Sequence, residues 1–163
     1  MKARLAISAL LACAAVTMVA CDDDNEPTGG GNTPETFTAT LAGADEVPPV
    51  TTTATGSAGF TATPGTSATT VTYSVTVNGL TGPAVAAHIH GPADVNTAAG
   101  VIVPLTITGT GTSGAIIGGS FTSTGNANVS MDSLLVLLRN GNAYVNVHTA
   151  LHPDGEIRGQ IRP

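Results

Sequence analysis

Charged and aromatic side chains are scarce in this sequence, and their scarcity argues against several classes of protein. Charged residues make up 10% of the 163 residues and aromatic residues 3%, and there is no tryptophan. Beyond residue 21 there is no lysine, and the basic residues are Arg139, Arg158 and Arg162. The formal net charge of the chain is -6. Binding to a phosphate backbone requires a basic face, so the composition argues against nucleic acid as a partner.

Cysteine is also rare, and both cysteines lie within the first 21 residues. An apolar run from Leu5 to Ala20 follows a short positive region and ends in Met-Val-Ala-Cys at Cys21. This is the plan of a secretory signal, and the small residue before the cysteine favours attachment of a diacylglycerol. We therefore predict a lipoprotein signal peptide over 1–20 and lipidation of Cys21. The alternative is a plain signal peptide or a single N-terminal membrane helix, although the run is short for a span of ~20 residues.

Lipidation at Cys21 predicts where the protein resides. The acyl chains would anchor it in the bacterial cell envelope, on the periplasmic side of the outer membrane or at the cell surface. Residues 21–35 are acidic and rich in glycine, and we expect them to form a flexible tether rather than a packed structure. The remaining residues, 36–163, are long enough for one domain with its own core.

Residues 36–163 alternate between apolar and polar side chains with a period of two. The stretch TVTYSVTVNGL at 70–80 is the clearest case. Similar short segments recur about every ten residues, separated by turns of glycine, proline, asparagine and aspartate, which predicts an all-β antiparallel sandwich or barrel. MDSLLVLLRN at 131–140 breaks this pattern. We expect a short helix there that plugs one end of the β-core, begun by Ser130 and ended by Gly141.

All four histidines fall in two segments, AHIHGPA at 87–93 and VNVHTALHPDGEIRGQI at 145–161. If Val85, Ala87 and Ile89 face the core, His88 and His90 face outward. By the same rule His148 faces outward on a later strand, together with Tyr144, Asn146 and, on the last strand, Arg158. The turn at 152–155 joins the last two strands into a hairpin. The histidines then lie close together if the strand at 85–90 neighbours this hairpin.

Two hypotheses account for these histidines. In the first, His88, His90 and His148 bind a metal ion, because His-x-His on a strand presents two imidazoles on one face and three nitrogen ligands suit Zn²⁺ or Cu²⁺. His152, in the turn, is a weaker fourth ligand. In the second, the imidazoles only hydrogen-bond to loop backbone. The carboxylates of Asp45, Glu46, Asp154 and Glu156 lie in turn-like segments and are expected to be solvated.

Three motifs in order along the chain resemble those of the CHRD (chordin-type) domain family. They are FTATLAGADEVPPV, AHIHGPA and YVNVHTALHPDGEIRGQI. The resemblance implies an exported bacterial protein with a single domain of this kind. It also implies an all-β fold, a Greek-key sandwich or barrel that is superoxide-dismutase-like or immunoglobulin-like. The biochemistry of the family is largely undefined. The positions that match the family motifs are His88, His90, His148, Gly155, Glu156, Arg158 and Gly159.

The AHIHG stretch also looks like the His-x-His strand of copper/zinc superoxide dismutases. That enzyme's zinc loop and disulfide cysteines have no counterpart here, so dismutase activity is not supported. We therefore predict a non-enzymatic binding or interaction module with an unidentified protein or extracellular ligand. The alternative is a histidine-based protein that binds Cu or Zn or carries out redox chemistry.

Overall fold

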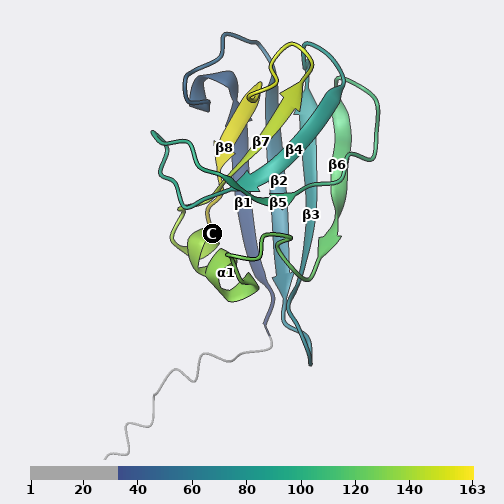
Figure 1. Ribbon diagram of the computed structural model, residues 1–163. Helices are drawn as coiled ribbons and strands as arrows, with labels where there is room; N and C mark the ends of the chain where they lie inside the picture. Colours follow the sequence, from purple (N-terminus) through teal and green to yellow (C-terminus); the bar gives the residue numbers. More distant parts are fainter. Residues whose placement is uncertain (1–32) are drawn as a thin grey trace, which may run out of the picture. The chain divides into compact units, whose positions relative to one another are not determined.

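The computed structural model describes residues 33–163, which form eight β-strands and one short α-helix (Figure 1). The predicted signal peptide (1–20), Cys21 and most of the tether lie outside the described residues. Among residues 33–163 no helix is long and apolar enough to cross a membrane. The elements are β1 (Glu35–Ala42), the 3-10 turn η1 (Gly43–Asp45), β2 (Thr55–Thr63), β3 (Thr70–Asn78), β4 (Ala84–His90), β5 (Val101–Pro104), β6 (Gly114–Phe121), α1 (Met131–Arg139), β7 (Tyr144–Thr149) and β8 (Ile157–Gln160).

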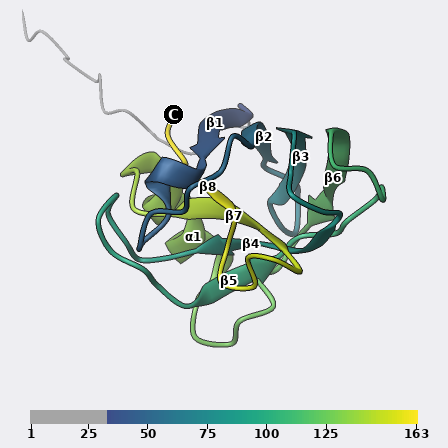
Figure 2. The ribbon, with the colours of Figure 1, turned by 90° about the horizontal axis from the view of Figure 1, so that it is seen from above.

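The strands form one antiparallel sheet in the order β5-β4-β7-β8-β1-β2-β3-β6. The sheet curls into a half-barrel, so that β1, β2, β3 and β6 face β8, β7, β4 and β5 across the core (Figure 2). The predicted all-β antiparallel fold is therefore confirmed. The predicted hairpin of the last two strands is also present, since β7 pairs directly with β8.

Alternation within the strands builds the core. In β1 and β3 every second residue is buried, as the period-two pattern requires. Phe37 and Phe60 lie opposite each other on β1 and β2, and each is 2% exposed. Val75 of β3 and Ile89 of β4 are fully buried within the same cluster. The two halves of the curled sheet thus share one hydrophobic core.

The segment that leads from β5 to β6 hydrogen-bonds to strands on both sides of the sheet. The Leu105 amide donates to Ala87 O of β4 at 2.8 Å. A few residues later, the Thr108 amide donates to Ile116 O of β6 at 2.7 Å, and Ile107 forms a bridge with Ile117. One segment therefore hydrogen-bonds to both sides of the half-barrel. This closure explains how β4 and β6, far apart in the strand order, enclose one core.

Helix α1 forms where the sequence predicted it. The Ser130 side chain accepts a hydrogen bond from the Ser133 amide at 3.1 Å and caps the first turn. Gly141 follows the helix with a φ of 65°, the left-handed conformation common after helix ends. Leu134 and Leu138 are fully buried, and α1 lies at one end of the strands (Figure 1). The helix therefore covers one end of the core.

One expected core position is wrong because β4 contains an irregularity, and β5 contains a similar one. Val85 is 57% exposed, since the pairing of β4 with β7 shifts between Ala84 and Ala86 and turns this side chain outward. Val101 is 41% exposed, whereas its neighbour Ile102 is buried, because the pairing of β4 with β5 shifts by one residue. In both places an extra residue reverses the face expected from strict alternation.

Candidate metal centre

The structure brings His88, His90 and His148 together on one face of the sheet. His88 and His90 lie on β4, and His148 lies on β7, the antiparallel neighbour of β4. Ile89 and Val147, adjacent to them in sequence, are fully buried in the core. Because side chains alternate along a strand, the three imidazoles leave the sheet on the face away from the core.

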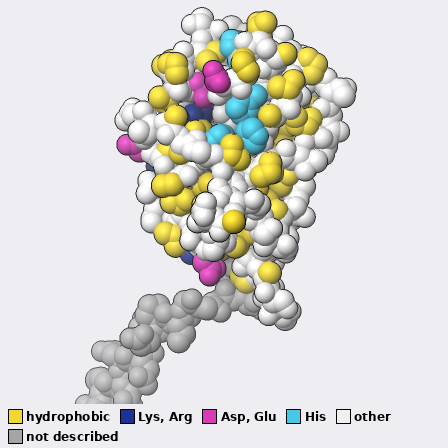
Figure 3. Space-filling view, viewed as in Figure 1, with side chains coloured by type: hydrophobic (Ala, Val, Ile, Leu, Met, Phe, Trp, Pro, Cys, Tyr) yellow, Lys and Arg dark blue, Asp and Glu magenta, His cyan; other side chains and the backbone are white. Residues whose placement is uncertain are grey.

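That face is covered by loops rather than open to solvent as the sequence argument assumed. His90 and His148 are each 8% exposed. Ala99, in the loop after β4, and Pro153, in the turn after β7, place their carbonyl oxygens against these rings. Alternation identifies the face of a strand but not the loops that fold over it. A small group of histidine side chains still reaches the surface on this side of the domain (Figure 3).

The imidazole nitrogens converge within reach of one ion. Each histidine offers one nitrogen such that all three lie within 4.8 Å of one another. His88 Nδ1 is 3.0 Å from His148 Nε2. The Asn146 Oδ1 atom lies between the rings of His148 and His90, 2.9 Å from His148 Nε2 and 3.0 Å from His90 Nε2. Asn146 shares its strand face with His148, but alternation alone did not assign it to the site.

Backbone carbonyls fix the tautomers of two of these histidines. His90 Nδ1 lies 2.9 Å from Ala99 O, and His148 Nδ1 lies 2.9 Å from Pro153 O. A carbonyl oxygen only accepts, so both Nδ1 atoms carry the proton, and in the neutral rings both Nε2 atoms keep a lone pair. These lone pairs point at the same region as Asn146 Oδ1, itself an acceptor. Histidines that ligate metals are oriented in this way by a hydrogen bond from the second ring nitrogen.

The surroundings favour neutral imidazoles. Burial, together with smaller contributions from the neighbouring His148 and His90, lowers the pKa of His88 to about 4. Burial also lowers the pKa of His90, although hydrogen bonds to Ala99 and Asn146 act in the opposite direction. Neutral imidazole is the form that binds metal ions. These two rings are therefore neutral at neutral pH, and each has one nitrogen without a proton.

His152 does not join the cluster. It lies in the turn between β7 and β8, where its backbone amide donates to Thr149 O at 3.1 Å. Among the described residues, the group that can reach one ion consists of His88, His90 and His148. This placement makes His152 a natural control for tests of the site.

The Tyr144 ring stacks on His90, and the Arg158 guanidinium stacks on Tyr144. The Tyr144 ring is parallel to the His90 ring within 3°, with 4.8 Å between centroids. The Arg158 guanidinium carbon lies 3.5 Å from the Tyr144 centroid, and its Nη2 donates to Asp94 O at 2.8 Å. Arg158 is 2% exposed, so this is a buried cation over an aromatic face. Period-two alternation placed Tyr144 on this face but did not reveal the stacking.

Glu46 is a buried member of this region that the sequence argument expected in solvent. It is 6% exposed, and its Oε1 atom has no hydrogen-bond partner. Burial raises the pKa of Glu46 to about 7, against the nearby positive charge of Arg158. Gly155 lies beside it with a φ of 128°, and a Cβ there would overlap Glu46 Oε1 and crowd the Asn146 amide. The glycine of the GEIRG motif thus makes room for this carboxylate.

Glu156 of the same motif is fully buried beneath threonines and is not solvated. Its carboxylate accepts hydrogen bonds from the hydroxyls of Thr81 and Thr149 at 2.7 Å each and from Thr52 at 3.0 Å. The Thr81 amide donates to it as well, at 3.0 Å. Burial acts to raise the pKa of Glu156, but these hydrogen bonds outweigh it and hold the pKa below the usual value.

The remaining motif residues have different roles. Arg158 belongs to the stack on Tyr144 and makes no ion pair with Glu156. Gly159 lies where β8 passes close to β1, and a Cβ there would overlap the Thr40 carbonyl oxygen. The GEIRG sequence therefore joins segments of the fold through two glycines, a buried acid and a buried cation.

The structure thus defines an all-β domain with a loop-covered cluster of three histidines on one face of its sheet. The CHRD domain family model matches residues 37–161, and the chain belongs to this family. No curated protein and no solved structure gave a match.

Proposed function

We propose that this chain is a binding module that holds one transition-metal ion, Cu²⁺ or Zn²⁺, through His88, His90 and His148. The observation that carries the proposal is the orientation of the rings: backbone carbonyls fix the Nδ1 protons of His90 and His148, so their Nε2 lone pairs face a common point. His88 Nδ1 supplies the third nitrogen. Neutral imidazole suits both metals, and the general order of affinities favours Cu²⁺ over Zn²⁺.

The distances are close to those that a metal ion requires. Nitrogens bound at ~2.0–2.1 Å around a tetrahedral ion lie roughly 3.4 Å from one another. His88 Nδ1 and His148 Nε2, 3.0 Å apart, already meet this condition. The widest separation, within 4.8 Å, closes by a small rotation of side chains. The ring set is therefore largely preorganised on two paired strands.

The competing arrangement is a purely structural hydrogen-bond network. If the Asn146 amide is turned over, its nitrogen donates to both Nε2 atoms, and its oxygen then faces Glu46. In that case Glu46 must be protonated to donate to this oxygen. This hydrogen-bond network needs no ion. The metal site and the network can therefore be distinguished by whether the purified protein takes up metal.

Metal analysis with matched histidine variants tests the proposal. The protein is stripped with chelator, incubated with Cu²⁺ or Zn²⁺, and desalted. We expect one equivalent bound by the wild type and by His152→Ala, and none by His88→Ala. Bound metal also raises the unfolding free energy, by about 2.7 kcal/mol at a free metal concentration 100 times Kd. If the wild type binds no metal, or His88→Ala and His152→Ala bind it equally, the proposal is wrong.

We further propose that the domain is exported and held at the cell envelope by a diacylglycerol on Cys21. This rests on the apolar run that ends in Met-Val-Ala-Cys. Labelling of cells with radioactive palmitate, followed by fractionation, tests it. We expect label and membrane association in the wild type and loss of both in Cys21→Ser. Membrane association that persists without label would indicate an uncleaved N-terminal helix instead.

A further inference from the structure

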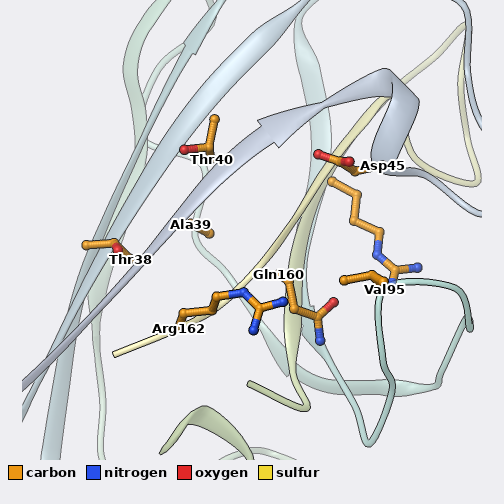
Figure 4. A pocket seen from close by; sticks show the side chains of 8 residues that line it. Thr38, Ala39, Thr40, Asp45, Val95, Gln160 and Arg162 are labelled. Carbon is orange, nitrogen blue, oxygen red and sulfur yellow. The ribbon is translucent and has the colours of Figure 1, made fainter. Parts of the chain in front are cut away.

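A cavity of about 330 Å³ lies beside the last strand, and its lining contains no histidine (Figure 4). Thr38 and Thr40 of β1 form one wall, and Gln160 and Arg162, from the end of the chain, form another. Cavities of this size, ~300–1,000 Å³, hold small organic ligands. The remaining lining residues are Ala39, Asp45, Val95 and Arg158.

The cavity gathers the two cations of the described chain that lack a carboxylate partner. Arg139 pairs with Glu35, whereas neither Arg158 nor Arg162 has a carboxylate oxygen within 4.0 Å among residues 33–163. Arg158 is held on its stack and by one hydrogen bond to Asp94 O. Arg162 is exposed, and its guanidinium extends toward Gln160 in Figure 4. Arg158 is 2% exposed and already held by these contacts, so the guanidinium that a ligand can reach is that of Arg162, and it favours an anionic group.

The cavity wall also contains an acceptor without a partner. Gln160 Nε2 donates to Ala93 O at 2.7 Å and to Gly141 O at 2.8 Å. Two carbonyl partners fix the orientation of this amide, and its Oε1 atom has no hydrogen-bond partner. Asp45 adds a second acceptor to the lining. A ligand that fits therefore combines an anionic group with hydrogen-bond donors.

One small inorganic anion is not expected to bind both arginines, because the Arg158 guanidinium is already held by the Tyr144 ring and by Asp94 O. Arg158, Gln160 and Arg162 follow one another at every second position, so the two arginine Cα atoms are roughly 13 Å apart. A tetrahedral anion would contact only one guanidinium. A longer ligand can place a carboxylate on one arginine and its hydroxyl groups along the rest of the wall.

We propose that this cavity binds a polyhydroxylated carboxylate of the sugar-acid class. The ligand carboxylate pairs with Arg162, whose planar guanidinium matches two carboxylate oxygens. The ligand hydroxyls donate to Gln160 Oε1 and Asp45 and accept from Thr38 and Thr40. The site contains none of the three histidines, although Arg158 belongs both to its lining and to the stack beside His90.

Nuclear magnetic resonance titration of the chelator-treated protein tests this proposal, with glucuronate as the probe and glucose as its neutral counterpart. We expect saturable shifts of the amides around 38–40 and 158–162 with glucuronate and none with glucose at up to about 10 mM. Arg162→Gln should weaken binding about tenfold or more, because it removes a charge-assisted pair. Arg139→Gln, which removes an arginine outside the cavity, should leave the affinity unchanged.

Three results would overturn the proposal: no shifts with glucuronate, equal affinity in Arg162→Gln and wild type, or binding of inorganic phosphate as tight as that of glucuronate. The His88→Ala variant separates this site from the metal centre. It should bind glucuronate as the wild type does, so failure of one site leaves the test of the other intact. Unchanged thermal melting of Arg162→Gln shows that a loss of binding does not arise from unfolding.

Discussion

Replacing Glu156 by glutamine removes the charge from a fully buried carboxylate that joins three segments of the chain. Thr52 comes from the loop after β1, Thr81 from the loop after β3, and Thr149 from the end of β7. Glutamine has nearly the same volume, so the core packing is kept. The variant therefore isolates the contribution of the charge and its hydrogen bonds.

The expected loss follows from the geometry of the carboxylate. The new NH₂ group cannot accept, so wherever it lies it meets a donor: the Thr81 amide contacts Oε1 at 3.0 Å and Oε2 at 3.3 Å. Threonine hydroxyls can rotate to accept, but a backbone N–H cannot. Hydrogen bonds to charged groups contribute ~1.5–3 kcal/mol each. With roughly one or two of them lost, we expect Glu156→Gln to lower the unfolding free energy by about 3 kcal/mol.

Urea denaturation at several pH values measures this loss. Hydrogen bonds hold the pKa of Glu156 below its usual 4.5. The stabilisation is therefore fully present above pH 4.5 and is lost as the pH falls through the lower pKa of the folded state. Wild type and Glu156→Gln should differ at neutral pH and converge in acid. Glu35→Gln, at an exposed ion pair, should change stability by only about 0–1 kcal/mol. If Glu156→Gln stays within about 0.5 kcal/mol of the wild type at neutral pH, the reasoning fails.

Two further substitutions test the buried carboxylate beside the metal centre. Gly155→Ala should lower the unfolding free energy in urea by about 3 kcal/mol, because the new Cβ would overlap Glu46 at a φ of 128°. Gly79→Ala, at a φ of 69° with open space around it, should cost only about 1 kcal/mol, and equal losses would contradict the packing argument. Glu46→Gln should stabilise the protein at about pH 8 and have little effect near pH 4.5, measured by thermal melting with chelator. Since the pKa of Glu46 is raised to about 7, the wild type loses stability as the pH rises from 4.5 through 7. A gain that does not change with pH would show that the charge of Glu46 is not its cause.

Local patterns in the sequence predicted the elements well, because they depend on near neighbours. Period-two alternation predicted an antiparallel fold of short strands, most clearly at β3, and the leucines of 134–138 with Ser130 and Gly141 predicted the helix. The same rule placed His88, His90 and His148 on the face away from the core. Where a strand gains an extra residue, as at Val85, the rule fails, because nothing in the local sequence marks the shift in pairing.

Features that depend on distant segments were not predictable. The carbonyls of Ala99 and Pro153 fix the histidine rings, but backbone carbonyls are the same in every residue and leave no trace in a sequence. Glu46 was expected in solvent because its neighbours form a turn, yet that turn folds against Gly155, more than one hundred residues later. The burial of Glu156 has the same origin, since its threonine partners come from two separate loops and the end of β7.

The position of β8 has a consequence for the order in which the chain folds. This last strand lies inside the sheet, between β7 and β1, and not at an outer edge. Until residues 157–160 have left the ribosome, β1 and β7 each expose an unpaired backbone edge, and the two halves of the half-barrel have no strand to join them. Nascent chains that lack residues 157–160 should therefore stay open and sensitive to protease, and the whole sheet should assemble in one step once β8 is available.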